Sequence, residues 1–584
     1  MNLQCRHQLR CKGPEMTYAA ISMEKTRWLI VLFTFCLSFL PSAHAHAQQL
    51  ENIRDQKPII LYGNMGVNLM FYHASGIPER MHPFSYVLSA NATATLYGIA
   101  MPFSLSFSDR QRNYTQPFNQ FGISPTYKWA TVHLGYRSLR FSDFTLAGHN
   151  FLGSGVELNP GKFRFGFVYG RFKKNTESNP QAIDTISSFK RKGLAIKIGV
   201  GSSKNFVDII FLSIKDDTTS LIGNEVSSLA APAQNLVAGL NSHFTFSKTL
   251  SFETEISGSL FTHDMKAPSL GDLNDVPILS GLEKLFVINQ SSAFYTAIRS
   301  SLLYKTKRVS TRLEYRHIDP GYNSMGAYFF NNDIENITLS PSFSLFKRKL
   351  ALRSSIGVQR DNLRNTKKAT ARRVISSLNA SYNPNQKFGI DVAYSNYSNN
   401  QRAGRVPLVD SLKVFTTTSN LSISPRLMYA TAERNHMIML LFNRMSLNDR
   451  NPQSTQLAET QATLFNAGYN LSLNASMLSF SLSLNHTLLN NFLMQSKATG
   501  GSLGISKSMQ KGRLTASFNN TLQRTNQLEE KGWVTNSSLN LTWRFIKKNT
   551  LRFGLFYINT SYPDGSVNPS FKEFKGDLSY VYTF

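Results

Sequence analysis

Arginines recur on one alternating face of a stretch near the middle of the chain. Arg308, Arg312 and Arg316 share this face with a single acid, Glu314, and apolar or small residues separate them. Three more arginines occupy comparable positions in other runs: Arg299, Arg353 and Arg544. A wall of arginines inside a pore selects anions. A solvated wall, with each charge screened within about 8 Å at physiological salt, explains the same pattern equally well.

Other residues with catalytic or metal-binding chemistry do not form a convincing set. The stretch 500–504, GGSLG, matches the letters of a nucleophile elbow around Ser502, but that motif works only at a strand-turn-helix corner. Here it lies within a strand pattern, so a glycine-rich strand is the favoured interpretation and a hydrolase ranks third among the functional hypotheses. The twelve histidines show no metal-ligand spacing. We therefore predict no enzyme activity, no metal and no cofactor.

The elements that carry these residues alternate with period two. In the stretch 534–546, Leu539, Leu541 and Trp543 alternate with Asn540, Thr542 and Arg544. Such alternation is typical of a strand whose two faces meet different surroundings. About 24 runs of this kind follow one another from residue 58 to the end, and helical spacing is not sustained anywhere.

The connections between these runs are of two kinds. Those after even-numbered runs are mostly tight, as at 97–98, 347–348 and 547–548, whereas those after odd-numbered runs, such as 109–125 and 263–289, are longer and polar. Outer-membrane barrels have short periplasmic turns and long outer loops. The sequence therefore predicts an all-β fold, a membrane-spanning antiparallel up-and-down β-barrel of about 22–24 strands, with no plug domain before it.

One connection breaks this rhythm. Residues 139–160 follow an even-numbered run, between predicted strands at 126–138 and 161–173, yet are far too long for a tight turn. One interpretation is a miscounted pair of strands. The other is a segment that folds into the lumen or contacts a periplasmic partner, in which case Glu157 is a candidate constriction acid.

The N-terminal region predicts export. Its segment MEKTRWLIVLFTFCLSFLPSAHAHAQQ has a basic start, a short apolar run and small residues before a cleavage site after Ala47. We expect residues 1–47 to be a removed leader, 48–57 a short periplasmic segment and 58–584 the barrel. All three cysteines, Cys5, Cys11 and Cys36, fall in the leader.

The net charge of +28 is strongly basic. An exported chain rarely meets nucleic acid, and the sequence contains no nucleic-acid-binding motif. Anionic lipids, lipopolysaccharide or anionic solutes are the expected partners instead. Lysines in the tight turns suit lipid phosphates in particular.

The last residues carry the clearest resemblance to a known class. Leu578, Tyr580, Tyr582 and Phe584 share one face of the final run. With the leader and the repeated amphipathic hairpins, they resemble bacterial outer-membrane β-barrel proteins, and the Asn-, Ser- and Tyr-rich loops are similar to barrels of the Bacteroidota type. The resemblance implies that these four residues are the signal read by the barrel-assembly machinery. It also implies an outer-membrane location.

Two functions from different classes follow. The first is a pore or passive transporter for small solutes, with anions favoured if the arginines line the lumen. The second is a structural or secretion-associated barrel that anchors or conducts a periplasmic or surface protein partner.

Overall fold

The computed structural model describes residues 58–97, 99–109, 120–176, 187–221, 231–269, 286–328, 331–403, 414–449, 451, 459–492 and 494–584. Every regular element in these ranges is a β-strand. No helix among the described residues is long and apolar enough to cross a membrane. The expected leader and the segment 48–57 lie outside the described residues.

The strands, in chain order, are β1 (Ile59–Ser75), β2 (Phe84–Leu96), β3 (Ile99–Ser108), β4 (Gln120–Ile123), β5 (Thr126–Tyr127), β6 (Ala130–Arg140), β7 (Ala147–Leu158), β8 (Phe163–Lys173), β9 (Lys190–Gly201), β10 (Phe206–Asp217), β11 (Gln234–Thr245), β12 (Leu250–Thr262), β13 (Ser292–Lys305), β14 (Val309–Ile318), β15 (Ile334–Leu345), β16 (Leu350–Arg360), β17 (Ala369–Tyr382), β18 (Phe388–Ala403), β19 (Phe415–Ala430), β20 (Arg434–Asp449), β21 (Thr460–Leu473), β22 (Leu478–Asn491), β23 (Gln495–Met509), β24 (Leu514–Gln527), β25 (Glu530–Ile546), β26 (Asn549–Ser561) and β27 (Phe571–Thr583).

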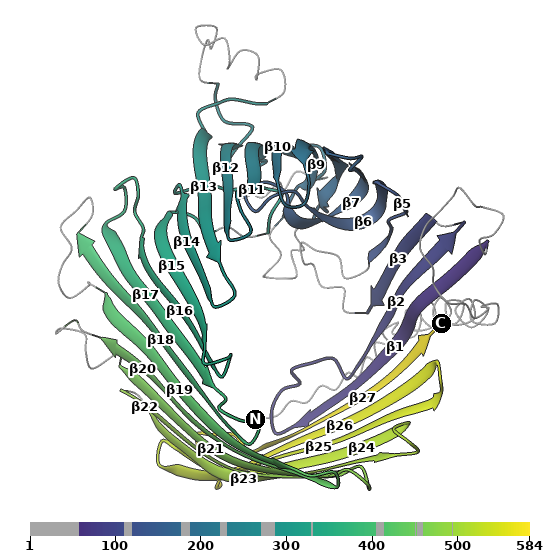
Figure 1. Cartoon of the computed structure of the whole chain (residues 1–584), viewed down its shortest axis with the longest axis vertical. Helices are drawn as coiled ribbons and strands as arrows, with labels where there is room; N and C mark the ends of the chain where they lie inside the picture. Colours follow the sequence, from purple (N-terminus) through teal and green to yellow (C-terminus); the bar gives the residue numbers. More distant parts are fainter. Residues whose placement is uncertain are drawn as a thin grey trace, which may run out of the picture.

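The strands form one closed antiparallel sheet. Each pairs with its neighbours in the chain, and β27 pairs with β1. The short strands β4 and β5 both lie between β3 and β6, so they share one position in the ring. The fold is therefore an up-and-down barrel of 26 strands. Figure 1 shows the ring, with β14–β18 facing β1–β3 across its interior.

The predicted all-β barrel is confirmed, but the count of 22–24 strands is too low. The predicted strand 126–138 corresponds to β5 and β6, and the segment 139–160 contains the unpredicted strand β7, so strands had been miscounted here. The first omission arises because β4 and β5 are too short to show a period. The second arises because Gly153 and Gly155 remove side chains from one face of β7.

Adding these two strands restores the alternation of connections. Tight turns now follow β5, at 128–129, and β7, at 159–162. The connection 141–146 lies at the end of the barrel where the longer connections are. Tight turns and longer connections therefore alternate around the ring, as expected of an up-and-down barrel.

Register places exposed apolar side chains in rows across one face of the sheet. Ile198, Ile209, Leu240 and Ile256 lie opposite one another on four successive strands. All four are exposed, with Ile209 the most open at 65%. A row of exposed β-branched and leucine side chains is stable against lipid rather than water. We assign this face to the outside of the barrel.

The seam is closed through the backbone. The Gly63 N–H donates to the Phe584 carbonyl at 3.2 Å, and the Phe584 N–H donates to the Gly63 carbonyl at 3.0 Å. Farther along the seam, the buried Tyr72 hydroxyl donates to Glu573 Oε1 at 2.5 Å. The two backbone bonds satisfy groups that would otherwise form an open sheet edge.

The aromatic face of the last strand lies at this seam. Leu578, Tyr580 and Tyr582 stand opposite Leu69, Val67 and Met65 of β1. Leu578 also stands opposite Phe553 of β26, which stands opposite Leu541 on the outer face of β25, so this face points outward. The ring of Tyr582 lies 5.8 Å from that of Phe584. Reading of this face by an assembly machinery stays a prediction.

Candidate functional site: the inner wall

Two connections lie against the inner face of β8–β14. Residues 141–146 join β6 to β7, and residues 319–328 follow β14. They pack on the strand face opposite the outward apolar rows, which places them inside the ring. We call these two segments together the inward lobe.

The two segments of the lobe are bonded to each other. The Tyr322 hydroxyl donates to the Phe144 carbonyl at 2.7 Å, and the Ser324 hydroxyl donates to the Thr145 carbonyl at 2.6 Å. Burial, followed by the nearby Glu255 charge, raises the pKa of Tyr322, so its hydroxyl keeps the proton that it donates. The lobe is thus one body rather than two independent loops.

Polar side chains of the wall fix the lobe in place. The Phe144 N–H donates to Glu255 Oε1 of β12 at 2.6 Å, and the Met325 N–H donates to Asn235 Oδ1 of β11 at 2.9 Å. Glu255 is 1% exposed. These acceptors satisfy backbone donors that would otherwise be buried without partners.

Apolar contacts seal the same interface. The lobe contributes Phe141, Leu146 and Met325 to a buried core, and the wall contributes side chains of β7–β12: Phe151, Val168, Phe172, Ala195, Ile210, Leu212, Ile214, Val237 and Phe261. A side-chain carbon at Gly166 would lie 2.8 Å from the Phe141 ring, and one at Gly239 would lie 2.7 Å from Thr145 Cγ2. These two glycines leave the space that the lobe fills.

Three of the six predicted arginines are paired with acids. Arg299 forms ion pairs with Asp143 of the lobe and, at 3.5 Å, with Glu255. Arg312 pairs with Glu253 at 3.7 Å. Arg316 pairs with Glu314 at 3.1 Å. The acids come from the lobe and from β12 as well as from β14 itself, so the positive charges of these three arginines are compensated.

Asp319 anchors the start of the second lobe segment. It accepts hydrogen bonds from the Thr296 N–H at 2.8 Å and the Thr296 hydroxyl at 2.9 Å, and it pairs with Arg364 at 3.3 Å. Burial acts to raise the pKa of Asp319, but these hydrogen bonds and the Arg364 charge outweigh it, and the pKa lies below its usual value. The anchor is therefore charged at neutral pH.

Arg353 differs from the paired arginines. It is exposed on the inner face of β16 and forms no ion pair with any residue that the structure describes. It borders a groove of about 610 Å³ over β16–β19, together with Asn379, Asp391 and Ser424. Asp391 in this groove is paired with Arg426 at 2.5 Å. Arg353 is thus the predicted lumen residue whose charge is available to a solute.

The other two arginines lie at the tight-turn end. Arg308 precedes β14 in the turn from β13, and Arg544 is near the end of β25; both are exposed. They lie at the mouth of the lumen rather than at mid-height of the wall.

Glu157 is part of the wall, on β7, and not of an inward loop. Its carboxylate lies 3.3 Å from His133 Nε2 and 3.5 Å from Lys197 Nζ, and Ser124 Oγ lies 2.9 Å from His133 Nδ1. This order of groups resembles a catalytic triad, but Ser124 is only 8% exposed and His133 only 9%. The contacts with His133 and Lys197 hold the Glu157 carboxylate in place on the wall. The part of segment 139–160 that enters the lumen is 141–146.

The candidate elbow around Ser502 lies inside a strand. Ser502 is in the middle of β23 and pairs with Ser483 and Thr521 on the flanking strands. Its hydroxyl lies 2.6 Å from Ser483 Oγ. These residues do not form the strand-turn-helix corner that the motif requires.

Sequence reasoning gave entry of residues 139–160 into the lumen as one of two interpretations, but it missed the second lobe segment, 319–328, and the acidic anchors. The available signal for the first segment was the run of apolar residues Leu139, Phe141, Phe144 and Leu146 in a connection expected to be a tight turn. For Glu255 no such signal exists, because an acid inside an alternating strand looks the same whether it is free or bonded.

The fold and its inner wall define a large closed β-barrel with a structured lobe on one side of its interior. A scan of family models finds no match for this sequence, and a search of curated proteins finds none. Among solved structures, OccAB2 of Acinetobacter baumannii is similar at 12% identity and a TM-score of 0.30, covering 61% of this chain and 92% of that one.

Two other solved structures illustrate the range of similar folds. The P pilus usher (PapC) translocation pore aligns at 10% identity and a TM-score of 0.35, over 90% of this chain and 99% of that one. OpdK of Pseudomonas aeruginosa, solved with vanillate, aligns at 10% identity and a TM-score of 0.30, over 60% and 93%. Scores of this size do not identify a function for this chain.

Proposed function

We propose that this protein is an outer-membrane barrel that conducts small solutes through its lumen, with a preference for anions. The observation that carries the proposal is the contrast between the two faces of one closed sheet. Its outside bears rows of exposed apolar side chains, whereas its inside bears charged and hydroxyl side chains. A closed sheet with this contrast satisfies its own backbone in lipid and encloses a polar path.

The height of the apolar band fits a membrane. Trp533 and Trp543 share the outer face of β25, ten positions apart, and are 49% and 43% exposed. Ten residues of strand rise about 33 Å. At a tilt of about 40°, this corresponds to about 25 Å along the barrel axis, the height of the apolar band between aromatic girdles. The two tryptophans thus suit the two membrane interfaces.

The function is tested by recording from the purified protein in a planar bilayer. The proposal predicts discrete conductance steps, with a reversal potential on the anion-selective side in a potassium chloride gradient. Protein that inserts into the bilayer but passes no current would overturn the proposal.

Charge reversal at Arg353 is expected to shift ion selectivity. Arg353→Glu replaces an uncompensated cation of the inner wall with an anion, so the reversal potential should move toward cations. The matched control is Arg348→Glu in the turn from β15 to β16, which changes the charge equally outside the wall. Equal shifts in the two variants would mean that Arg353 does not face the conducting path.

A second function is favoured by the strand count. Porins with 16–18 strands already enclose a water-filled channel, and 26 strands make a wider one. The alternative is therefore a barrel that anchors or conducts a partner protein. Affinity purification from outer membranes distinguishes the two, because a stoichiometric partner supports the alternative and an isolated conducting barrel supports the pore. Neither proposal assigns catalysis to the chain.

A further inference from the structure

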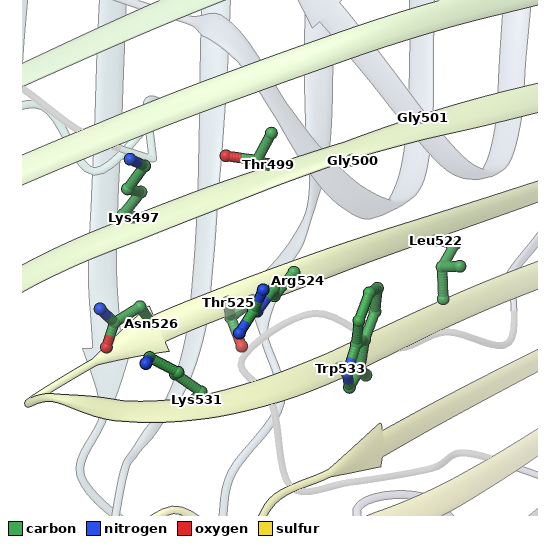
Figure 2. Close-up of a pocket in the computed structure, with 10 residues that line it drawn as sticks. All are labelled: Lys497, Thr499, Gly500, Gly501, Leu522, Arg524, Thr525, Asn526, Lys531 and Trp533. Atoms are coloured by element: carbon green, nitrogen blue, oxygen red, sulfur yellow. The ribbon is translucent and has the colours of Figure 1, made fainter.

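Three basic residues gather on the outer face of β23–β25, near the ends of these strands that face the longer loops. Lys497 lies opposite Asn526, which lies opposite Lys531; in the next row Thr499, Arg524 and Trp533 lie opposite one another. Directly opposed residues have their Cβ atoms about 4.5–5.5 Å apart. These side chains, drawn in Figure 2, line a groove of about 780 Å³. We call Lys497, Arg524 and Lys531 the basic patch.

The basic patch belongs to the lipid-facing side of the barrel. Along β24, Arg524 shares its face with the exposed apolar residues Leu522 and Phe518. Along β25, Lys531 shares its face with Trp533 and Trp543. The patch therefore begins at the level of the tryptophan that marks one edge of the apolar band. This is the depth at which lipid headgroups lie.

The charge of the patch is not compensated within the described part of the protein. None of the three cations forms an ion pair or a side-chain hydrogen bond with a described residue. All three are exposed. Two acids are close to the patch in sequence. Glu529 is exposed in the turn between β24 and β25, and Glu530 accepts hydrogen bonds from the connection after β26, among them those from the Val567 N–H at 3.0 Å and Asn568 Nδ2 at 2.8 Å.

Short connections leave the patch open from above. β24 and β25 are joined by residues 528–529, and β22 and β23 by residues 492–494, whereas β12 and β13 are joined by residues 263–291. A bulky headgroup can therefore reach the patch from the membrane plane.

We propose that the basic patch binds the phosphate groups of a phosphorylated lipid of the outer leaflet. Lysine and arginine side chains donate charge-assisted hydrogen bonds to phosphate oxygens, and Trp533 packs against the region where headgroup and acyl chains meet. Basic pockets at membrane interfaces recognise phosphorylated headgroups in this way. The inference rests on the proposed membrane location of the barrel, but not on conduction.

The test measures retention of bisphosphorylated lipid A by the full-length barrel. Protein in detergent is titrated with lipid A and bound lipid is counted by native mass spectrometry. The triple variant Lys497→Gln, Arg524→Gln, Lys531→Gln should weaken binding by about 100-fold, from the attraction contributed by each basic residue. The matched control, Lys507→Gln, Lys547→Gln, Lys548→Gln, removes three cations near the tight-turn ends of neighbouring strands, where lysines would meet inner-leaflet phosphates rather than lipid A, and should retain wild-type binding of lipid A.

Several results would overturn the proposal. Unchanged binding by the triple variant, or an equal loss in the control, would show that lipid A does not use the patch. Competition by millimolar inorganic phosphate as effective as unlabelled lipid A would point to a free-phosphate site. Dephosphorylated lipid A binding as well as the phosphorylated form would exclude phosphate recognition.

Folding and membrane insertion are checked separately. Heat-modifiable migration on gels should show that the triple variant is folded, and Arg524→Gln alone serves if it is not, with a smaller expected loss of about tenfold or less. Conductance of the triple variant in lipid A-free bilayers should match the wild type. A wild-type protein that does not insert into bilayers would refute the membrane proposal itself, whereas normal insertion with unchanged lipid binding would refute the patch alone.

Discussion

Arg299→Met is expected to lower the free energy of unfolding by about 3–5 kcal/mol. The substitution keeps much of the side-chain volume but removes the guanidinium that Asp143 and Glu255 share. Glu255 is almost fully buried, so its carboxylate would lose its cation without gaining water. A buried charge left without its partner is among the most destabilising changes known in proteins.

The measurement is urea-induced unfolding of the protein in lipid vesicles, followed by tryptophan fluorescence. Limited proteolysis should in addition cut Arg299→Met within 141–146, because the first lobe segment loses its ionic contact with the wall. Arg353→Met is the matched control, since that arginine has no ion pair among the described residues. A stability for Arg299→Met equal to that of the control would contradict the role assigned to the ion pairs.

A second substitution tests whether the unpaired charge of Glu255 causes the loss of stability in Arg299→Met. Adding Glu255→Gln to Arg299→Met removes the unpaired charge while leaving an amide oxygen to accept from the Phe144 N–H. The double variant should recover most of the lost stability. Failure to recover would mean that Arg299 acts through packing rather than charge.

Removal of residues 578–584 is expected to abolish the folded barrel. These residues pair with β1 on one side and with β26 on the other. Their loss would leave backbone donors and acceptors of both neighbours facing lipid, each at a cost of several kcal/mol. Refolding into lipid vesicles, followed by heat-modifiable migration, should give no folded band.

The Phe584→Ala variant distinguishes closure of the barrel by residue 584 from recognition of its aromatic ring by the assembly machinery. The backbone hydrogen bonds between residue 584 and Gly63 do not need the aromatic ring, so the variant should refold in vesicles nearly as well as the wild type. In cells its assembly should fall severalfold if the assembly machinery reads the ring. Equal losses in vesicles and in cells would show that Phe584 is needed for stability rather than for recognition.

The strands that sequence alone predicts are those whose two faces differ in side-chain type. β15 alternates exposed Ile337 and Leu339 with small polar residues, and its period is visible in one line of sequence. β7 carries glycines on its inner face because the lobe and the neighbouring strands approach closely there. A face without side chains gives no period, so the strand could not be recognised.

The sequence predicts which strand face carries the arginines of the site, but not which acids pair with them. Alternation alone assigns Arg312 and Arg316 to one face of β14, and the structure agrees. Which acids compensate the arginines depends on more distant residues: Arg312 pairs with Glu253 of β12, and Arg299 pairs with Glu255 of β12 and Asp143 of the first lobe segment. The contact from Phe144 to Glu255 spans 111 positions, and no local pattern specifies such a distant pairing.

The bond between Tyr72 and Glu573 joins positions 501 apart in the chain. Contacts between such distant positions form late, because nearly the whole chain must be in place before its ends can meet. Until β27 pairs with β1, the incomplete sheet has two edges with unpaired backbone groups. An unpaired sheet edge can pair with other polypeptides. Correct folding therefore requires that the edge of β1 be protected until β27 pairs with it.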